Sequence, residues 1–156
     1  MSMDEIIELV RSLPGSLVVT PGPGDGTPEL AWGDAFFYHA PDGVMPTNEQ
    51  PYATVVTKDY PDDTASRLGN GRWRVNIHVG RATFVELTGE NPRDLGSHWD
   101  HAAEDMLMPH PVYGALGWLA VIDPGPATSA TLERLLRDAH HAARARHERR
   151  EARASG

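Results

Sequence analysis

The sequence contains no cysteine, which excludes disulfide bonds and thiolate chemistry. It has no apolar run of the roughly 18 residues that a membrane-spanning helix needs. The opening stretch, MSMDEIIELV, is acidic, and its apolar part is too short for a signal peptide. Lysine is almost absent too, since Lys58 is the only one among 14 basic residues. These absences predict a cytoplasmic protein with no membrane segment.

Positive charge is scarce over most of the chain, whose formal net charge is -8. Residues 1–132 carry 7 basic and 18 acidic side chains, whereas residues 133–156 carry 7 basic and 4 acidic ones. An acidic body repels a phosphate backbone, which argues against nucleic acid as a partner. We therefore interpret the basic end as a frayed tail over residues 147–156, following one domain over residues 1–146.

Helices are predicted at both ends of the chain. Ser2 and Glu5 have the spacing of a capping box, in which each side chain bonds the other residue's backbone N–H. The short amphipathic helix that follows has an apolar stripe at Met3, Ile6, Ile7 and Val10. A longer helix is predicted from Thr128 or Ser129, with an apolar stripe at Leu132, Leu135, Leu136, Ala139 and Ala143.

The middle of the chain is rich in strand patterns. Strands are predicted over 17–20, 29–32, 34–39, 52–57, 72–79 and 118–122. Short helices are predicted over 62–68 and 80–88, and a further one begins at Ser97. Grouped strands with helices at the ends predict a single-domain α+β fold. In it, an antiparallel sheet is covered on one face by the N- and C-terminal helices.

Residues 72–79 alternate between apolar and polar side chains, as a half-exposed strand does. The polar side carries Arg72, Arg74, Asn76 and His78 in a row. Such a row could bind an anion, but a solvated sheet face is the commoner explanation of this pattern.

His110 is held between Pro109 and Pro111, which impose an extended backbone and prevent a helix there. Together with Tyr113 it forms a polar pair just before the buried strand. The pair either lines the mouth of a pocket or is satisfied by backbone groups at the strand entrance. The candidate ligand-binding residues are Lys58, Asn76, His78, His110 and Tyr113.

Three side chains of the predicted helix after Ser97 are weak candidates for a metal site. His98, His101 and Asp105 would share one face, and imidazole and carboxylate groups so placed can bind zinc. That face lies opposite an apolar stripe of Trp99, Ala102, Ala103 and Met106, so it is more simply a solvated surface. We therefore predict no metal and no cofactor.

Several stretches resemble the MmcQ/YjbR-like proteins, which share a fold with the CyaY (frataxin-like) proteins. They are VVTK followed by DYPDDTASRL, and GWLAVID followed by ATLERLLRDAHHAA. The resemblance implies a YjbR/CyaY-like fold and DNA binding, or weak metal binding on acidic helices such as the one with Asp4, Glu5 and Glu8. The chain also resembles actinobacterial proteins of no established activity that carry AWGDAFFYHAPDG, VVTKDYPDD and MPHPVYGALGW.

Three functions follow as hypotheses. The preferred one is a module, monomeric or homodimeric, that binds an unknown small molecule or protein in a groove near the candidate residues. The alternative is a cofactor-independent enzyme with His110 as general acid or base and Lys58 as electrostatic donor or nucleophile. The third is a nucleic-acid-binding regulator, and whether the protein is an enzyme stays open.

Overall fold

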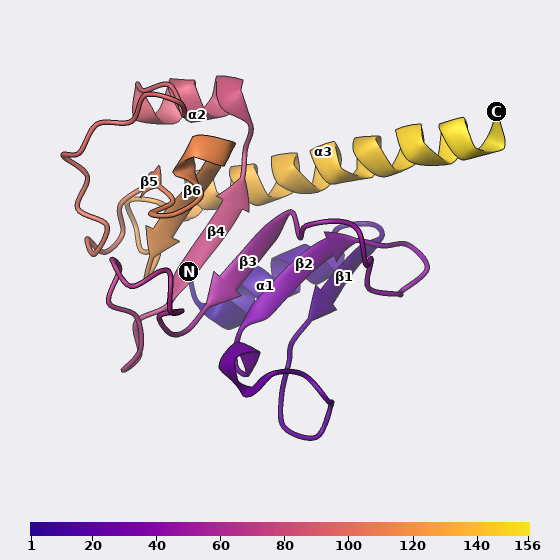
Figure 1. Ribbon diagram of the computed structural model, residues 1–156, viewed down its shortest axis with the longest axis horizontal. Helices are drawn as coiled ribbons and strands as arrows, with labels where there is room; N and C mark the ends of the chain where they lie inside the picture. The colour runs from indigo at the N-terminus through magenta and orange to yellow at the C-terminus, as the bar shows by residue number, and fades with distance from the viewer.

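The computed structural model describes residues 1–156 and shows one antiparallel sheet with helices at both ends of the chain (Figure 1). Six strands follow one another across the sheet in the order β1-β2-β3-β4-β6-β5. The strands are β1 (Ser16–Val19), β2 (Ala35–His39), β3 (Ala53–Val56), β4 (Arg74–His78), β5 (Met108–Pro109) and β6 (Trp118–Ile122). The helices are α1 (Met3–Ser12), α2 (Arg81–Thr88) and α3 (Ser129–Ser155), with short 3-10 helices η1 (Glu29–Ala31) and η2 (Gly114–Leu116). The predicted α+β fold is confirmed.

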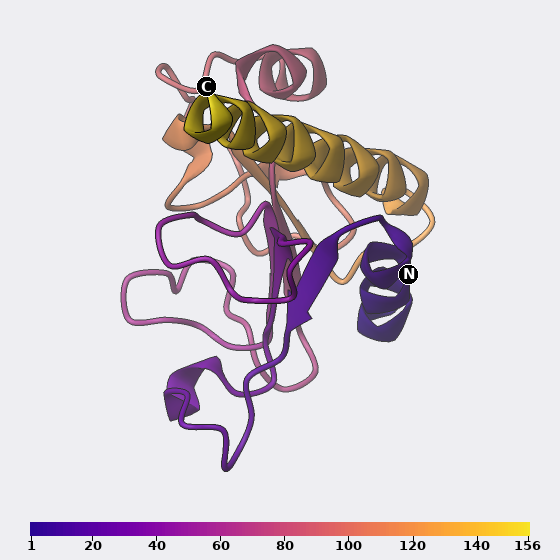
Figure 2. The ribbon, with the colours of Figure 1, turned by 90° about the vertical axis from the view of Figure 1, so that its right-hand side faces the viewer.

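Helices α1 and α3 cover one face of the sheet (Figure 2). The predicted capping box is formed, with Ser2 Oγ accepting from the Glu5 N–H at 3.1 Å. Alternate residues of the strands, including Phe37, Val55 and Val75, pack against both helices in one apolar cluster. Every predicted residue of the α3 stripe is buried there. The amphipathic patterns therefore did predict this face, because burial on one side leaves a period in the sequence.

Three local predictions are wrong. No strand forms over 29–32: residues 29–31 form η1, and Gly33 turns the chain with φ +87° shortly afterwards. No helix forms over 62–68, where the Asp63 carboxylate binds Arg74 and Arg67 has φ +51°. No helix follows Ser97 either, because residues 97–107 form turns in which side chains such as Asp100 bind nearby backbone.

The expected solvated face of the strand over 72–79 is also wrong. The strand begins at Arg74, and the side chains of Arg74 and Asn76 are buried, with 1% and 3% of their surface exposed. The loops that follow β3 and precede η2 lie over this part of the sheet, on the side opposite α1 and α3 (Figure 2). We call this second side the loop-covered face.

Helix α3 continues without a break through the segment for which fraying is predicted. An ion pair joins Arg150 on that segment to Glu49 in the loop between β2 and β3. None of the helices combines the length and the apolar composition needed to cross a membrane.

Candidate functional site

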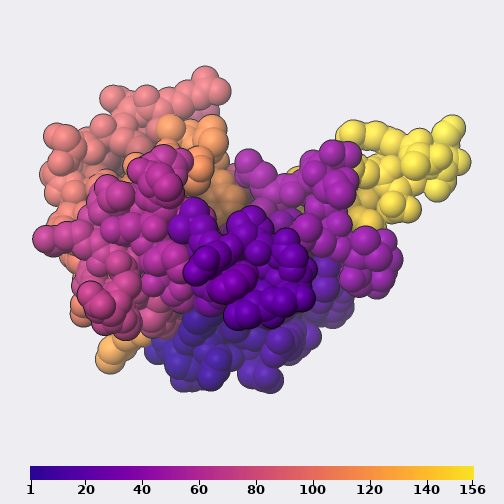
Figure 3. Space-filling model, turned by 60° about the horizontal axis from the view of Figure 1, so that its bottom comes forward, coloured from indigo at the N-terminus to yellow at the C-terminus, as the bar shows by residue number.

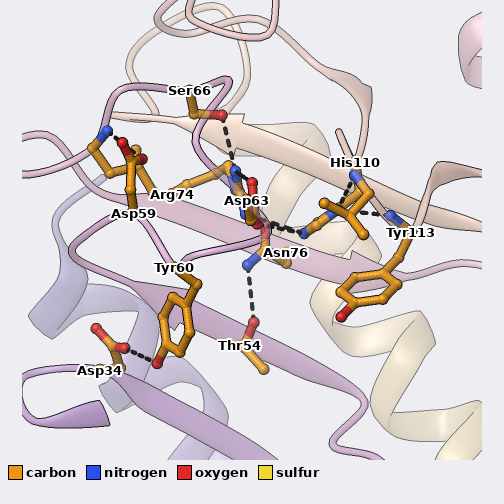
Figure 4. Close-up of polar contacts among 12 residues, drawn as sticks. Asp34, Thr54, Asp59, Tyr60, Asp63, Ser66, Arg74, Asn76, His110 and Tyr113 are labelled. Carbon is orange, nitrogen blue, oxygen red and sulfur yellow. Dashed lines mark hydrogen bonds and ion pairs between the residues drawn. The ribbon is translucent and has the colours of Figure 1, made fainter. Parts of the chain in front are cut away.

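A pocket of about 280 Å³ opens on the loop-covered face. Its floor follows one row of the sheet, because strand pairing sets Phe36 beside Thr54 and Thr54 beside Asn76. Its rim comes from Tyr113 in the loop before η2, from Leu116 at the end of η2, and from the loop after β3. Figure 4 shows Tyr60 and Tyr113 on either side of this row. Sequence-distant segments thus meet around a mixed apolar and polar hollow.

Arg74 holds the deepest part of the site together. Its guanidinium donates to Asp63 through both terminal nitrogens, at 3.1 and 2.5 Å. It also donates to Ser66 Oγ at 2.9 Å and to Asn76 Oδ1 at 2.7 Å, and it lies 3.1 Å from Nε2 of His110. Four of the five N–H groups of the guanidinium therefore donate to protein oxygens, and the fifth is directed at the His110 ring. Arg74 is thus a structural support of the pocket floor.

Asp63 completes the buried ion pair. Burial alone raises the pKa of Asp63, but the hydrogen bonds and the charge of Arg74 outweigh it and hold that pKa below its usual value. The carboxylate is thus charged at neutral pH, and the pair fixes the loop after β3 against the sheet. A paired buried charge of this kind is costly to break from one side.

Asn76 and Thr54 form the part of the floor that can address a ligand. Because Asn76 Oδ1 accepts from Arg74, its amide nitrogen points the other way and donates to Thr54 Oγ1 at 3.0 Å. The Thr54 O–H and the second amide N–H have no partner within the protein. The floor therefore presents an amide N–H in a fixed orientation and, beside it, a hydroxyl whose hydrogen can rotate towards a ligand (Figure 4).

His110 is satisfied by backbone groups and also lines the pocket, so both predicted roles apply to it. Its Nδ1 accepts from the N–H groups of Val112 and Tyr113 at 3.0 and 2.9 Å. Burial, reinforced by the charge of Arg74, lowers the pKa of His110 to about 3. Because Nδ1 already accepts two backbone N–H groups and Nε2 lies beside the Arg74 cation, a second proton on the ring is disfavoured. His110 is therefore neutral and positions the loop of Tyr113.

Tyr113 and Tyr60 flank the opening differently. The Tyr113 ring packs on His110 with centroids 5.0 Å apart, is 44% exposed and keeps its hydroxyl free. The Tyr60 hydroxyl instead donates to the buried carboxylate of Asp34 at 2.5 Å. Burial, followed by the interactions with Asp34, raises the pKa of Tyr60. Tyr113 is thus the adaptable aromatic side of the pocket.

The remaining candidates lie elsewhere. Lys58 is 3.0 Å from Asp34 Oδ1 and donates to the Trp32 carbonyl, so it neutralises a buried carboxylate outside the pocket. His78 packs against Trp118, with centroids 5.6 Å apart, in an adjoining groove. The structure therefore brings together Asn76, His110 and Tyr113 and separates Lys58 and His78 from them.

The weak metal candidates are dispersed, because the helix that would align them does not form. His98 lies 3.9 Å from Glu90, and the Asp105 carboxylate accepts the N–H groups of Gly125, Ala127 and Thr128 before α3. The structure contains no group of three histidine or acidic side chains placed to hold a metal ion.

Sequence reasoning missed three members of the site. Arg74 was visible in the polar row and Asp63 in an acidic cluster, but nothing in the spacing linked them. Thr54 carried no signal at all, since threonine is common in strands.

Comparison with known proteins supplies a family and no activity. A family model described as a family of unknown function, DUF6194, matches residues 1–152. No curated protein and no solved structure matches the chain, and nothing found supports the resemblance to MmcQ/YjbR-like proteins or an actinobacterial source. The match covers nearly the whole chain, and the protein therefore belongs to the DUF6194 family.

Proposed function

We propose that this protein binds a small organic molecule in the pocket on the loop-covered face. The observation that carries the proposal is that separate groups of residues make the pocket rigid, supply its hydrogen-bond donors and form its apolar walls. A buried ion pair makes the floor rigid, the lining residues Thr54 and Asn76 each keep a free donor, and aromatic side chains form the walls. Ligand sites commonly combine apolar walls with a few placed polar groups.

The geometry favours binding over catalysis. An acid–base mechanism needs a side chain that gains and loses a proton near neutral pH. His110, the candidate for that role, is neutral, and Lys58, the candidate nucleophile, is paired with Asp34 outside the pocket. The residues meant to act together in the enzymatic alternative therefore do not face the same space.

The volume of the pocket and its lining residues indicate the size and chemistry of the ligand. A volume of about 280 Å³ suits a molecule of one or two rings. Tyr113 and Trp118 offer aromatic surfaces for stacking, and Thr54 and Asn76 offer donors to a carbonyl or hydroxyl oxygen. We expect a small, partly aromatic ligand with at least one acceptor.

The test compares two neighbouring residues of similar exposure. A fragment library is screened by ligand-observed NMR against the wild type, and dissociation constants are measured for the hits. Tyr113→Ala should weaken them about tenfold, as loss of an aromatic contact does. Val112, which is 39% exposed and does not line the pocket, supplies the control Val112→Ala, with unchanged affinity. Hits that bind both variants as tightly as the wild type would contradict the proposal.

A further inference from the structure

A second groove of about 250 Å³ adjoins the pocket. It lies between the loop joining β2 to β3 and the C-terminal half of α3, and Figure 3 shows the surface hollowed between that loop and the segment around η2. The groove and the pocket share Gln50, Pro51 and Trp118 as lining residues. One molecule could therefore extend from one hollow into the other.

Positive charge in this groove lacks a partner. Its charged side chains are Arg146, Arg150 and Glu49, and Glu49 is already bound to Arg150 at 2.5 Å. Arg146 is partly buried and forms no hydrogen bond and no ion pair. Burial, and then the charge of Arg150, lowers the pKa of Arg146. In a chain of net charge -8, this is an unusual place for an unpaired guanidinium.

His78 connects Arg146 to the pocket. It lines the same groove and packs on Trp118, which also lines the pocket. Burial and the nearby charge of Arg146 lower the pKa of His78, so its imidazole is neutral at pH 7. An interaction of the ring with the Leu116 backbone carbonyl opposes this shift and already uses the single N–H of a neutral imidazole. His78, one of the candidate binding residues, therefore helps to shape the groove between Arg146 and Trp118.

We infer that the ligand is an organic acid, whose ring occupies the pocket and whose oxyanion lies in the second groove against Arg146. This inference rests on the proposed function. A guanidinium binds the two oxygens of a carboxylate or phosphate through parallel N–H groups. The bound anion would also neutralise a partly buried charge that has no direct ion-pair partner in the protein and is only partly offset by Glu49, which is itself bound to Arg150.

The test uses a matched acid and amide. Benzoate, benzamide, phenyl phosphate and inorganic phosphate are titrated by NMR into the wild type, Arg146→Gln and Arg149→Gln. Arg149 is exposed, lies on the same helix and does not line the groove. The wild type and Arg149→Gln should bind benzoate or phenyl phosphate about tenfold more tightly than benzamide. Arg146→Gln should abolish that preference, and comparing the two acids identifies a carboxylate or a phosphate ligand.

The outcomes separate this inference from the function on which it rests. Equal binding of acid and amide to the wild type would overturn the inference, as would an equal loss in both arginine variants. The inference would also be overturned if the chemical shifts of the Arg146 side chain did not change on addition of benzoate, phenyl phosphate or inorganic phosphate. The proposed pocket would survive any of these results if the library hits still bind and Tyr113→Ala still weakens them.

Discussion

The two faces of the sheet are stabilised in different ways. The face under α1 and α3 is an apolar cluster of 18 buried residues. The loop-covered face is instead held by a buried ion pair, a buried amide and a buried histidine. Apolar packing is non-directional and tolerates small shifts, whereas hydrogen-bonded charges require fixed geometry. The first face therefore supplies stability, and the second supplies a rigid, shaped surface that can bind a ligand.

The largest loss of stability should come from placing a charge in the apolar face. Leu135 is fully buried, so Leu135→Asp would leave an unpaired carboxylate in the core. We expect a loss of about 5 kcal/mol in the free energy of unfolding, enough to unfold or aggregate the protein. Thermal unfolding followed by circular dichroism measures it. The exposed neighbour provides the control Arg134→Asp, with little change. A soluble Leu135→Asp variant with unchanged Tm would refute the packing.

A smaller loss is expected when the ion pair of the loop-covered face is broken. Arg74→Met leaves Asp63 buried without its partner and should cost about 3 kcal/mol in urea unfolding. The double variant Arg74→Met/Asp63→Leu should recover part of that stability, since no charge then remains unpaired. If the double variant is less stable than the single one, the coupling of these two residues is not the source of the loss.

A substitution in the floor of the pocket should lower the free energy of unfolding by less than either of these changes. Thr54→Val keeps the shape of the side chain and removes the acceptor of the Asn76 amide. Since the amide N–H then faces the open pocket, the free energy of unfolding should fall by only about 1 kcal/mol. Chemical denaturation measures this change. An unaltered Asn76 side-chain resonance in the variant would show that the hydrogen bond does not exist in solution.

The smallest effect is confined to acid pH and concerns Asp105, which links the loops to the start of α3. Hydrogen bonds from Thr128, and then from the N–H groups of Gly125 and Ala127, lower the pKa of Asp105 to about 2, from 3.8. Its carboxylate therefore stabilises the fold above about pH 4, and that contribution is lost as the pH falls towards 2.

Asp105→Asn provides the measurement. Asparagine tolerates the positive φ of 51° at this position, so the variant removes the titratable charge, and one accepting oxygen with it, without straining the backbone. Between about pH 4 and pH 2, the free energy of unfolding of the wild type should fall more steeply than that of the variant. Parallel curves for the two proteins over this range would contradict the assignment.

The sequence by itself determined the parts of this protein whose side chains repeat with the period of a helix or a strand. Both terminal helices, their buried stripes and the buried strand β6 follow from apolar patterns, and α1 also from its capping box, because one-sided burial leaves a periodic trace. The pocket left no such trace. Arg74 contacts Asp63, which is 11 residues away in sequence, and His110, which is 36 residues away, and both lie in loops without periodicity.

Only the tertiary structure decided which polar residues became buried and which met at the pocket. Two members of the polar row, Arg74 and Asn76, would be solvated in an open sheet and become internal only when the loops fold over them. Burial of a charged group depends on whether a partner from elsewhere arrives to pair with it. That partner is chosen by the path of the loops in space, and no local pattern of residues encodes it.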